Sequence, residues 1–275
     1  MTMSTRSLLA LATLTLAPAW AQLSAPNYAG VRLGHIHLAV QDVDAQKHFW
    51  IDMMGGKLVT KEPLELIQFP GVYIMLRKAT EPTQPPEGSV VNHFGFVFAD
   101  LPSMLAKWKA GGVQVDQAGN PNQGMVHAPD GIRVEFFGDP SITVPVKMDH
   151  IHDQVVDVPG VQAWYAKAFG GIPGDRVRVA TPGLTPCVYV PGTNVSFNDT
   201  FPGSKTGAKP AGTKGRSLDH IGFDVTNLDQ FAKKLEAQGI KLDVPIRQLP
   251  NSNTKIAFLT DPWGTYIEVT ENLAP

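Results

Sequence analysis

Six of the eight histidines in this chain stand at matching places in four similar segments. Each segment continues as an alternation of apolar and polar residues, which is typical of a β-strand. The six are His35, His37, His93, His150, His152 and His220. Imidazole is a common metal ligand, and its repetition in every unit indicates that the units converge on a metal ion.

Two glutamates repeat in the same manner. Glu135 ends the stretch 129–135 and Glu268 ends the matching stretch 262–268, and each stands inside an apolar run. A buried carboxylate is unfavourable unless it is paired or coordinated. Alternate residues of a strand share a face, so the histidines lie opposite the large apolar residues, on a face where they can meet the glutamates.

The elements that carry these residues follow one order in all four units. A strand comes first, then a turn suited to cap a helix, a stretch with apolar residues at helical spacing, a closing glycine and further short strands. The capping positions are Asp42, Asp157 and Asn227. The same offset separates His35 from His150 and Gly55 from Gly170. This self-similarity predicts an α+β fold built from four β-α-β-β-β units.

The first residues have the pattern of a targeting segment. Arg6 precedes the apolar run 8–16 and the small-x-small site 19–21, which is the order of a secretory signal peptide. Residues 1–21 are therefore expected to be removed, leaving a periplasmic or secreted chain with no membrane association. A single N-terminal membrane anchor is the alternative. Residues 202–217, rich in Gly, Lys, Pro and Ser, are expected to form a flexible loop.

The composition is that of an ordinary globular protein. The net charge of −2 and the lack of a basic stripe argue against nucleic acid or an anionic membrane as a partner. Cys187 is the only cysteine, so no disulfide can form within the chain. Stability must come from burial of an apolar core, which this length permits.

The histidine and glutamate segments resemble those of the vicinal oxygen chelate superfamily, which includes glyoxalases, fosfomycin-resistance proteins and extradiol dioxygenases. The resemblance runs from about Gly30 to Leu273 and rests on the strand starts at 35–40 and 219–225 and on the ending at 261–268. It implies that the units pair, 30–145 as a first pair and 146–274 as a second. Each pair would form a cupped, partly open mixed β-barrel with its helices outside, around one divalent metal.

Carried over by position, the resemblance implies two sets of metal ligands. The first pair of units offers His35, His93 and Glu135, and the second offers His150, His220 and Glu268. Met75 and Ser196 stand where glyoxalase-like members can have a fourth ligand, and neither suits that role, so three protein ligands are expected. Such a site leaves a divalent ion (Fe2+, Zn2+, Mn2+, Ni2+ or Co2+) with open positions for two neighbouring oxygens of a substrate.

Three further residues are candidates for proton transfer. His37 and His152 each lie two residues after an implied ligand, on the same strand face, where each can serve as acid or base for a chelated substrate. A hydrogen-bonded supporting role is the alternative. Tyr266 is expected to present its phenol to the substrate, with simple packing as its alternative.

The sequence thus predicts a metal-dependent enzyme for a small substrate with vicinal oxygens, acting by glyoxalase-, isomerase- or lyase-type proton transfer. Extradiol ring cleavage is the first alternative, although Phe258 and Met125 occupy the places where extradiol enzymes of this superfamily carry a tyrosine. A non-catalytic binding protein of the bleomycin-resistance kind is the second, although such binders have generally lost the metal ligands. The duplicated units allow either a monomer or a homodimer.

Overall fold

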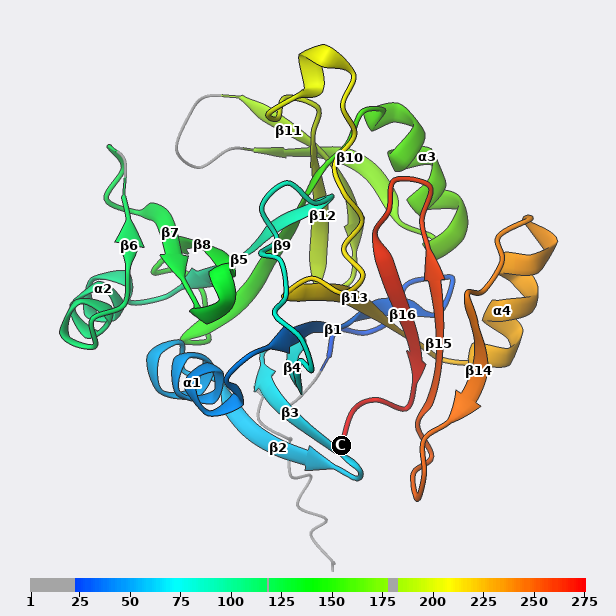
Figure 1. Ribbon diagram of the computed structural model, residues 1–275, viewed down its shortest axis with the longest axis horizontal. Helices are drawn as coiled ribbons and strands as arrows, with labels where there is room; N and C mark the ends of the chain where they lie inside the picture. Colours follow the sequence, from blue (N-terminus) through cyan, green and yellow to red (C-terminus); the bar gives the residue numbers. More distant parts are fainter. Residues whose placement is uncertain (1–22, 118, 178–182) are drawn as a thin grey trace, which may run out of the picture.

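The computed structural model describes residues 23–117, 119–177 and 183–275. These residues form two eight-stranded mixed sheets with four α-helices outside them, and neither sheet closes on itself (Figure 1). The α+β class, the β-α-β-β-β units and the cupped, open shape predicted from the sequence are confirmed. The predicted signal peptide lies outside the described residues.

The first sheet joins the first unit to the fourth. Its strand order is β14-β15-β16-β13-β1-β4-β3-β2. The bounds are β1 Val31–Val40, β2 Lys57–Lys61, β3 Leu64–Phe69, β4 Val72–Lys78, β13 Leu218–Val225, β14 Val244–Gln248, β15 Lys255–Thr260 and β16 Tyr266–Glu271. At the centre of this sheet β1 runs antiparallel to β13 and parallel to β4, and β13 runs parallel to β16.

The second sheet joins the second unit to the third in the same design. Its strand order is β10-β11-β12-β9-β5-β8-β7-β6. The bounds are β5 Val91–Phe98, β6 Val115–Asp116, β7 Gln123–His127, β8 Arg133–Gly138, β9 Val146–Gln154, β10 Ile172–Val177, β11 Leu184–Val190 and β12 Thr193–Asn198. Here β5 runs antiparallel to β9 and parallel to β8, and β9 runs parallel to β12.

The expectation that 30–145 forms one cup and 146–274 forms the other is wrong. Strands from 30–145 and from 146–274 enter both sheets. The short connection between β8 and β9 explains why the middle units pair, because short connections place consecutive strands near one another. The N–H of Asp139 donates to the carbonyl of Phe98, and that of Ala99 donates to Pro145, so β9 begins against the end of β5. The first and fourth units therefore pair with each other in the other sheet.

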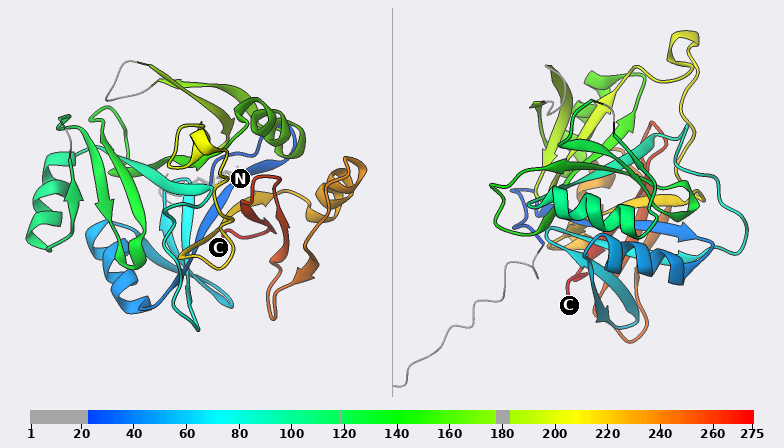
Figure 2. Two further views of the ribbon diagram at one scale, coloured as in Figure 1. Left: turned by 45° about the horizontal axis from the view of Figure 1, so that its top comes forward. Right: turned by 90° about the vertical axis from the view of Figure 1, so that its left-hand side faces the viewer.

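Consecutive units do meet, but through their helices. Helix α1 (Val43–Lys47), continued by the π-helix η2 (His48–Met53), lies beside α2 (Leu101–Ala110), where Trp108 Nε1 donates to the carbonyl of Met53 (Figure 2). In the other half, Lys234 of α4 (Leu228–Ala237) donates to Ala168 of α3 (Val158–Phe169). None of the helices in the described ranges combines the length and apolar character needed to cross a membrane.

The start of each helix is fixed by a side chain at the end of the preceding strand. The predicted caps are confirmed: the side chains of Asp42, Asp157 and Asn227 accept backbone N–H groups of the first turn, and Asp100 does the same for α2. Such caps satisfy N–H groups that have no partner within the helix. They set the point at which each strand leaves its sheet.

The apolar core lies between the sheets and the helices. Trp50 of η2 stacks on Phe94 of β5, with ring centroids 5.7 Å apart, and Phe69 of β3 meets Phe96 of β5 at 4.8 Å. These side chains are buried; Trp50 and Phe69 come from the first unit, and Phe94 and Phe96 belong to a strand of the second sheet. One continuous core therefore holds the two sheets together. The histidines of the same strands lie on the opposite face, as strand alternation predicts.

Candidate metal centre

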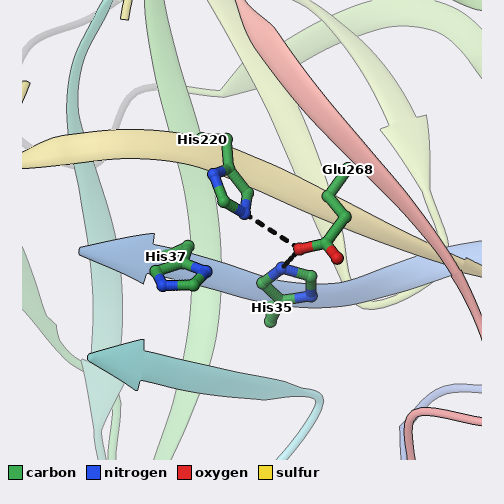
Figure 3. Close-up of side chains that lie close together, drawn as sticks. All are labelled: His35, His37, His220 and Glu268. Carbon is green, nitrogen blue, oxygen red and sulfur yellow. Dashed lines mark hydrogen bonds and ion pairs between the residues drawn. The ribbon is translucent and has the colours of Figure 1, made fainter. Parts of the chain in front are cut away.

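The histidines and glutamates gather in two groups, one on each sheet. In the first group, site A, the Nε2 atoms of His35 (β1) and His220 (β13) each lie 2.9 Å from Oε2 of Glu268 (β16) (Figure 3). All three side chains are buried. Three neighbouring strands of one sheet therefore direct three donor atoms to one point.

Site B repeats this arrangement on the second sheet. Nε2 of His150 (β9) lies 3.1 Å from Oε2 of Glu135 (β8), and Nε2 of His93 (β5) lies 3.4 Å from the same oxygen. The two Nε2 atoms are 3.5 Å apart. As in site A, an antiparallel strand pair supplies the imidazoles and a strand parallel to one of them supplies the carboxylate.

The structure brings all six predicted ligands together, but not in the predicted combination. The predicted sets were His35 with His93 and Glu135, and His150 with His220 and Glu268. Both sets are wrong, because β1 and β5 lie in different sheets, as do β9 and β13. Each half of the chain therefore contributes donors to both sites.

The donor atoms fit a divalent metal. With metal–nitrogen distances of about 2.1 Å, two ligands of one ion lie roughly 3.0–3.5 Å apart. Five of the donor–donor distances in the two sites run from 2.9 to 3.5 Å. Imidazole suits zinc, iron, nickel and cobalt, and a carboxylate adds the negative charge that a dication favours. The residues present can thus hold one ion in each site.

Hydrogen-bond acceptors orient three of the four imidazoles. The Nδ1 atoms of His93, His150 and His220 lie 2.8, 2.8 and 2.6 Å from the side-chain oxygens of Asn92, Asp149 and Asp219. Such contacts fix the tautomer of a ligand histidine and aim its other nitrogen at the metal. These acceptors were not predicted as part of the site, although each directly precedes its histidine in the sequence. Gly34 stands at that place before His35, whose Nδ1 has no partner among the described residues.

The electrostatics keep both glutamates charged. Burial opposes ionisation of Glu268, but hydrogen bonds from His220 and His35 outweigh it and hold the pKa of the carboxyl well below its usual range. The same balance with His150 and His93 lowers the pKa of Glu135. Two carboxylates are therefore available to a cation at neutral pH.

The pKa values of His93 and His220 are shifted in opposite directions. Burial lowers the pKa of His93 to about 4, against its hydrogen bond with Glu135. Burial also opposes protonation of His220, but its contacts with Asp219 and Glu268 outweigh this and raise its pKa. The Nδ1 atom of His220 thus contacts a carboxylate, that of Asp219, where the Nδ1 atom of His93 contacts the amide oxygen of Asn92.

Two glycines make room for imidazoles across the central strand pairs. Gly222 lies opposite His35 in the register of β1 and β13, and Gly95 lies opposite His150 in that of β5 and β9. A Cβ at Gly222 would stand 2.1 Å from Cε1 of His35, and a Cβ at Gly95 would stand 2.5 Å from Cε1 of His150. Carbon atoms in contact lie about 3.5–4.0 Å apart. Each imidazole keeps its place because the facing residue has no side chain.

We expect Gly222→Ala to displace the His35 imidazole and to lower the metal affinity of site A at least about tenfold, the smaller of the losses that follow when a ligand is no longer oriented. Metal stoichiometry and chelator competition measure this change. Gly34→Ala is the control, because a Cβ there would make a tight contact of 3.2 Å with the backbone nitrogen of Asp224, whereas a Cβ at Gly222 would overlap the His35 imidazole itself. Equal affinities for the wild type and both variants would contradict the position described for His35.

His37 and His152 lie beside the two sets of donors. The ring centroids of His37 and His220 are 4.5 Å apart, and those of His152 and His93 are 4.7 Å apart. In each group the ligand-type atoms, those of His37 or His152 included, lie within 4.8 Å of one another. Burial, and then the neighbouring histidines, hold the pKa of both side chains well below the usual value. Their role in proton transfer stays a prediction.

A cavity of about 490 Å3 opens over site A, and His37, His220 and Glu268 lie in its wall. Tyr266 also lines it, stacked on Phe258 with ring centroids 5.1 Å apart. Burial raises the pKa of Tyr266 to about 12, so its phenol stays protonated. The rest of the lining is mainly apolar, with three exposed basic residues: Arg77, Lys214 and Arg247. The size suits a small organic molecule.

The carboxylates of the two sites have different neighbours. In site B, Nε2 of Gln123 donates to the second oxygen of Glu135 over 2.6 Å. Gln123 lies opposite Phe137 on β8, two residues after Glu135, and at the equivalent place in site A Ile256 lies opposite Thr270. Glu135 is therefore anchored by an amide, whereas the wall beside Glu268 is apolar.

Comparison with known proteins agrees with this geometry. The family model described as the Glyoxalase/Bleomycin resistance protein/Dioxygenase superfamily matches residues 32–136 and 147–269. These matches span most of the chain, which belongs to this superfamily. A comparison with curated proteins found no significant match.

Solved structures with the same fold include two with different described activities. Glyoxalase I from Zea mays is 17% identical, with a TM-score of 0.68 over 88% of this chain and 92% of that chain. A candidate dioxygenase from Bacillus subtilis is 12% identical, with a TM-score of 0.62 over 92% of this chain and 86% of that chain. At this level of identity the likeness establishes the fold alone.

Proposed function

We propose that this protein is a divalent-metal-dependent enzyme that acts on a small substrate with vicinal oxygens by glyoxalase-, isomerase- or lyase-type proton transfer. One observation carries the proposal: in site A the buried donor atoms of His35, His220 and Glu268 converge, and two of these residues, His220 and Glu268, lie in the wall of a cavity that can admit such a substrate. A divalent ion held there supplies Lewis acidity to two neighbouring substrate oxygens and so makes an adjacent C–H group more acidic.

The chain's own residues then bind and orient the substrate. The apolar wall around Phe258 and Ile256 excludes water from one side, and the phenol of Tyr266 faces the same space. Because that phenol stays protonated, it can donate a hydrogen bond or a proton to a substrate oxygen. Tyr266 is therefore our candidate proton donor in site A.

Ring-cleaving dioxygenation is the second candidate, and one contact favours it. Phe258 lies opposite Glu268 in the register of β15 and β16. It fills the place where a tyrosine was expected for this chemistry, but the ring of Tyr266 stacks on it at an angle of 15°. The phenol of Tyr266 thus lies next to Phe258, the position where a tyrosine was expected.

A single set of measurements separates these functions. Protein loaded with Zn2+, Mn2+, Ni2+ or Co2+, or with Fe2+ in a reducing buffer, is incubated in D2O with an α-hydroxyketone, the thiohemiacetal of a 2-oxoaldehyde, or catechol. Proton transfer gives deuterium at the substrate carbon or an isomerised product, seen by NMR, and metal-stripped protein gives neither. Oxygen uptake with catechol supports the dioxygenase instead. Binding by calorimetry without turnover, unchanged after metal removal, would leave only a ligand-binding protein.

We also propose that the chain is exported, on the grounds of the signal-peptide pattern in residues 1–21. Amino-terminal sequencing of the protein recovered from a periplasmic extract should then start near Gln22. Recovery of the uncleaved chain from the cytoplasm would contradict export. Export also bears on the metal, since iron(II) is hard to keep reduced outside the cytoplasm.

A further inference from the structure

His37 and His152 occupy places that the other two units fill differently. The position two residues after the first histidine of each unit is His37, Gly95, His152 or Gly222. Each of these residues pairs, in parallel register, with one residue of the closing strand of the same unit. The partners are Met75, Glu135, Ser196 and Glu268, in the same order.

The residues at the two paired positions complement each other in every unit. Where the closing strand carries a glutamate, the facing position is glycine, as in Gly95 with Glu135 and Gly222 with Glu268. Where the closing strand carries Met75 or Ser196, which are poor ligands for a dication, the facing position is histidine. Every unit thus has one ligand-type side chain at this pair of neighbouring positions. In one unit of each site, a histidine on the first strand thus replaces the glutamate of the closing strand.

From this exchange we propose that His37 and His152 are the fourth protein ligands of sites A and B, so that each ion is bound by three imidazoles and one carboxylate. The inference rests on the proposed metal function and replaces the acid–base role predicted for these two histidines. It also revises the expected number of protein ligands from three to four. A six-coordinate ion then keeps two positions, which is what a substrate with two vicinal oxygens requires.

The geometry of His37 supports this role. Both of its ring nitrogens are buried and have no hydrogen-bond partner among the described residues. Figure 3 shows one of them facing the cluster formed by His35, His220 and Glu268. A buried polar group without a partner is destabilising by about 1–3 kcal/mol. Metal coordination would satisfy one of the two nitrogens.

The two sites agree in detail, although their sequences differ. His37 and His220 meet with rings 4.5 Å apart and tilted by 53°, and His152 and His93 meet at 4.7 Å and 39°. Within one strand, the ring centroids of His35 and His37 are 6.2 Å apart, and those of His150 and His152 are 5.8 Å apart. The same residue type therefore takes the same place beside the donor atoms in both sites.

The test exchanges the ligand between the two neighbouring strands. Zn2+ and Co2+ affinities of site A are measured by chelator competition in a Glu135→Gln background, which removes site B. We expect His37→Gly to weaken binding at least about tenfold, and His37→Gly with Met75→Glu to restore most of the loss, because it recreates the pairing of Gly222 with Glu268. X-ray absorption of the Co2+ protein should show one histidine fewer after His37→Gly.

Controls separate the possible failures. His48→Ala alters an exposed histidine paired with Asp52 and should leave the affinity unchanged. An unchanged affinity in His37→Gly, together with a lost affinity in His220→Ala, would overturn the fourth ligand and leave the metal function standing. No loss in His220→Ala would overturn both. If His37→Gly does not fold, His152→Gly with and without Ser196→Glu, in a Glu268→Gln background, gives the same test in site B.

Discussion

Glu268→Gln is expected to reduce the metal content of the protein from two ions per chain to one. The variant keeps the shape of the side chain, but it removes the charge that both His35 and His220 contact at 2.9 Å. Loss of a hydrogen-bond partner of a ligand typically lowers metal affinity about 10–100-fold, and loss of a ligand itself should exceed that. Elemental analysis of purified, dialysed protein measures the change.

The mirror variant and a surface control complete this experiment. Glu135→Gln should empty site B only, and the double variant should bind no metal at either site. Glu65→Gln removes an exposed carboxylate that pairs with Lys47, so it should keep the wild-type stoichiometry. Full metal content in the double variant would show that these carboxylates do not hold the metal.

Trp50→Ala is expected to lower the free energy of unfolding by about 3–5 kcal/mol, the usual loss for a large aromatic removed from a core. Trp50 is fully buried, stacks on Phe94 and donates from Nε1 to Oε1 of Gln46 over 2.8 Å. Because Phe94 belongs to the second sheet and Trp50 to the first unit, the cavity would open between the two sheets. Urea unfolding followed by circular dichroism measures the effect.

Two further variants test this explanation. Trp50→Phe retains a ring against Phe94 but leaves the buried Oε1 of Gln46 without its donor, so the loss should be about 1–3 kcal/mol. Trp164→Ala removes a tryptophan of α3 that is only partly buried, and it should destabilise the protein less than Trp50→Ala. Unfolding free energies of Trp50→Ala and the wild type that agree within 1 kcal/mol would contradict the central role of Trp50.

The sequence predicted the units and the donor residues because local patterns encode both. Alternation placed the histidines opposite the apolar residues, and Asp42, Asp157 and Asn227 marked the helix starts that the structure confirms. These features depend on neighbours within a few positions along the chain. The pairing of units depends instead on which strand edges meet, and four similar units offer several compatible answers.

The combination of donors therefore could not be read from the repeats. The offset between His35 and His150 shows that their units are alike, but likeness does not show which units share a sheet. The connection 139–145 determines the pairing of the second and third units through backbone hydrogen bonds at Phe98 and Pro145. Backbone hydrogen bonds of this kind do not depend on residue type, so the sequence does not indicate them. The acceptor residues are a different case. Asp149 and Asp219 stand directly before their histidines, so a search for second partners of each imidazole would have found them.

The crossed pairing of the units has a consequence for the way the chain can be divided. A cut within 139–145 would give two fragments of similar size, each with its own packed helices but with the central strand of each sheet, β1 and β5 or β9 and β13, missing its antiparallel neighbour. Neither fragment would hold a complete set of donors. Together they would rebuild both cups, and two copies of a half-length chain related by a twofold axis could build the same assembly.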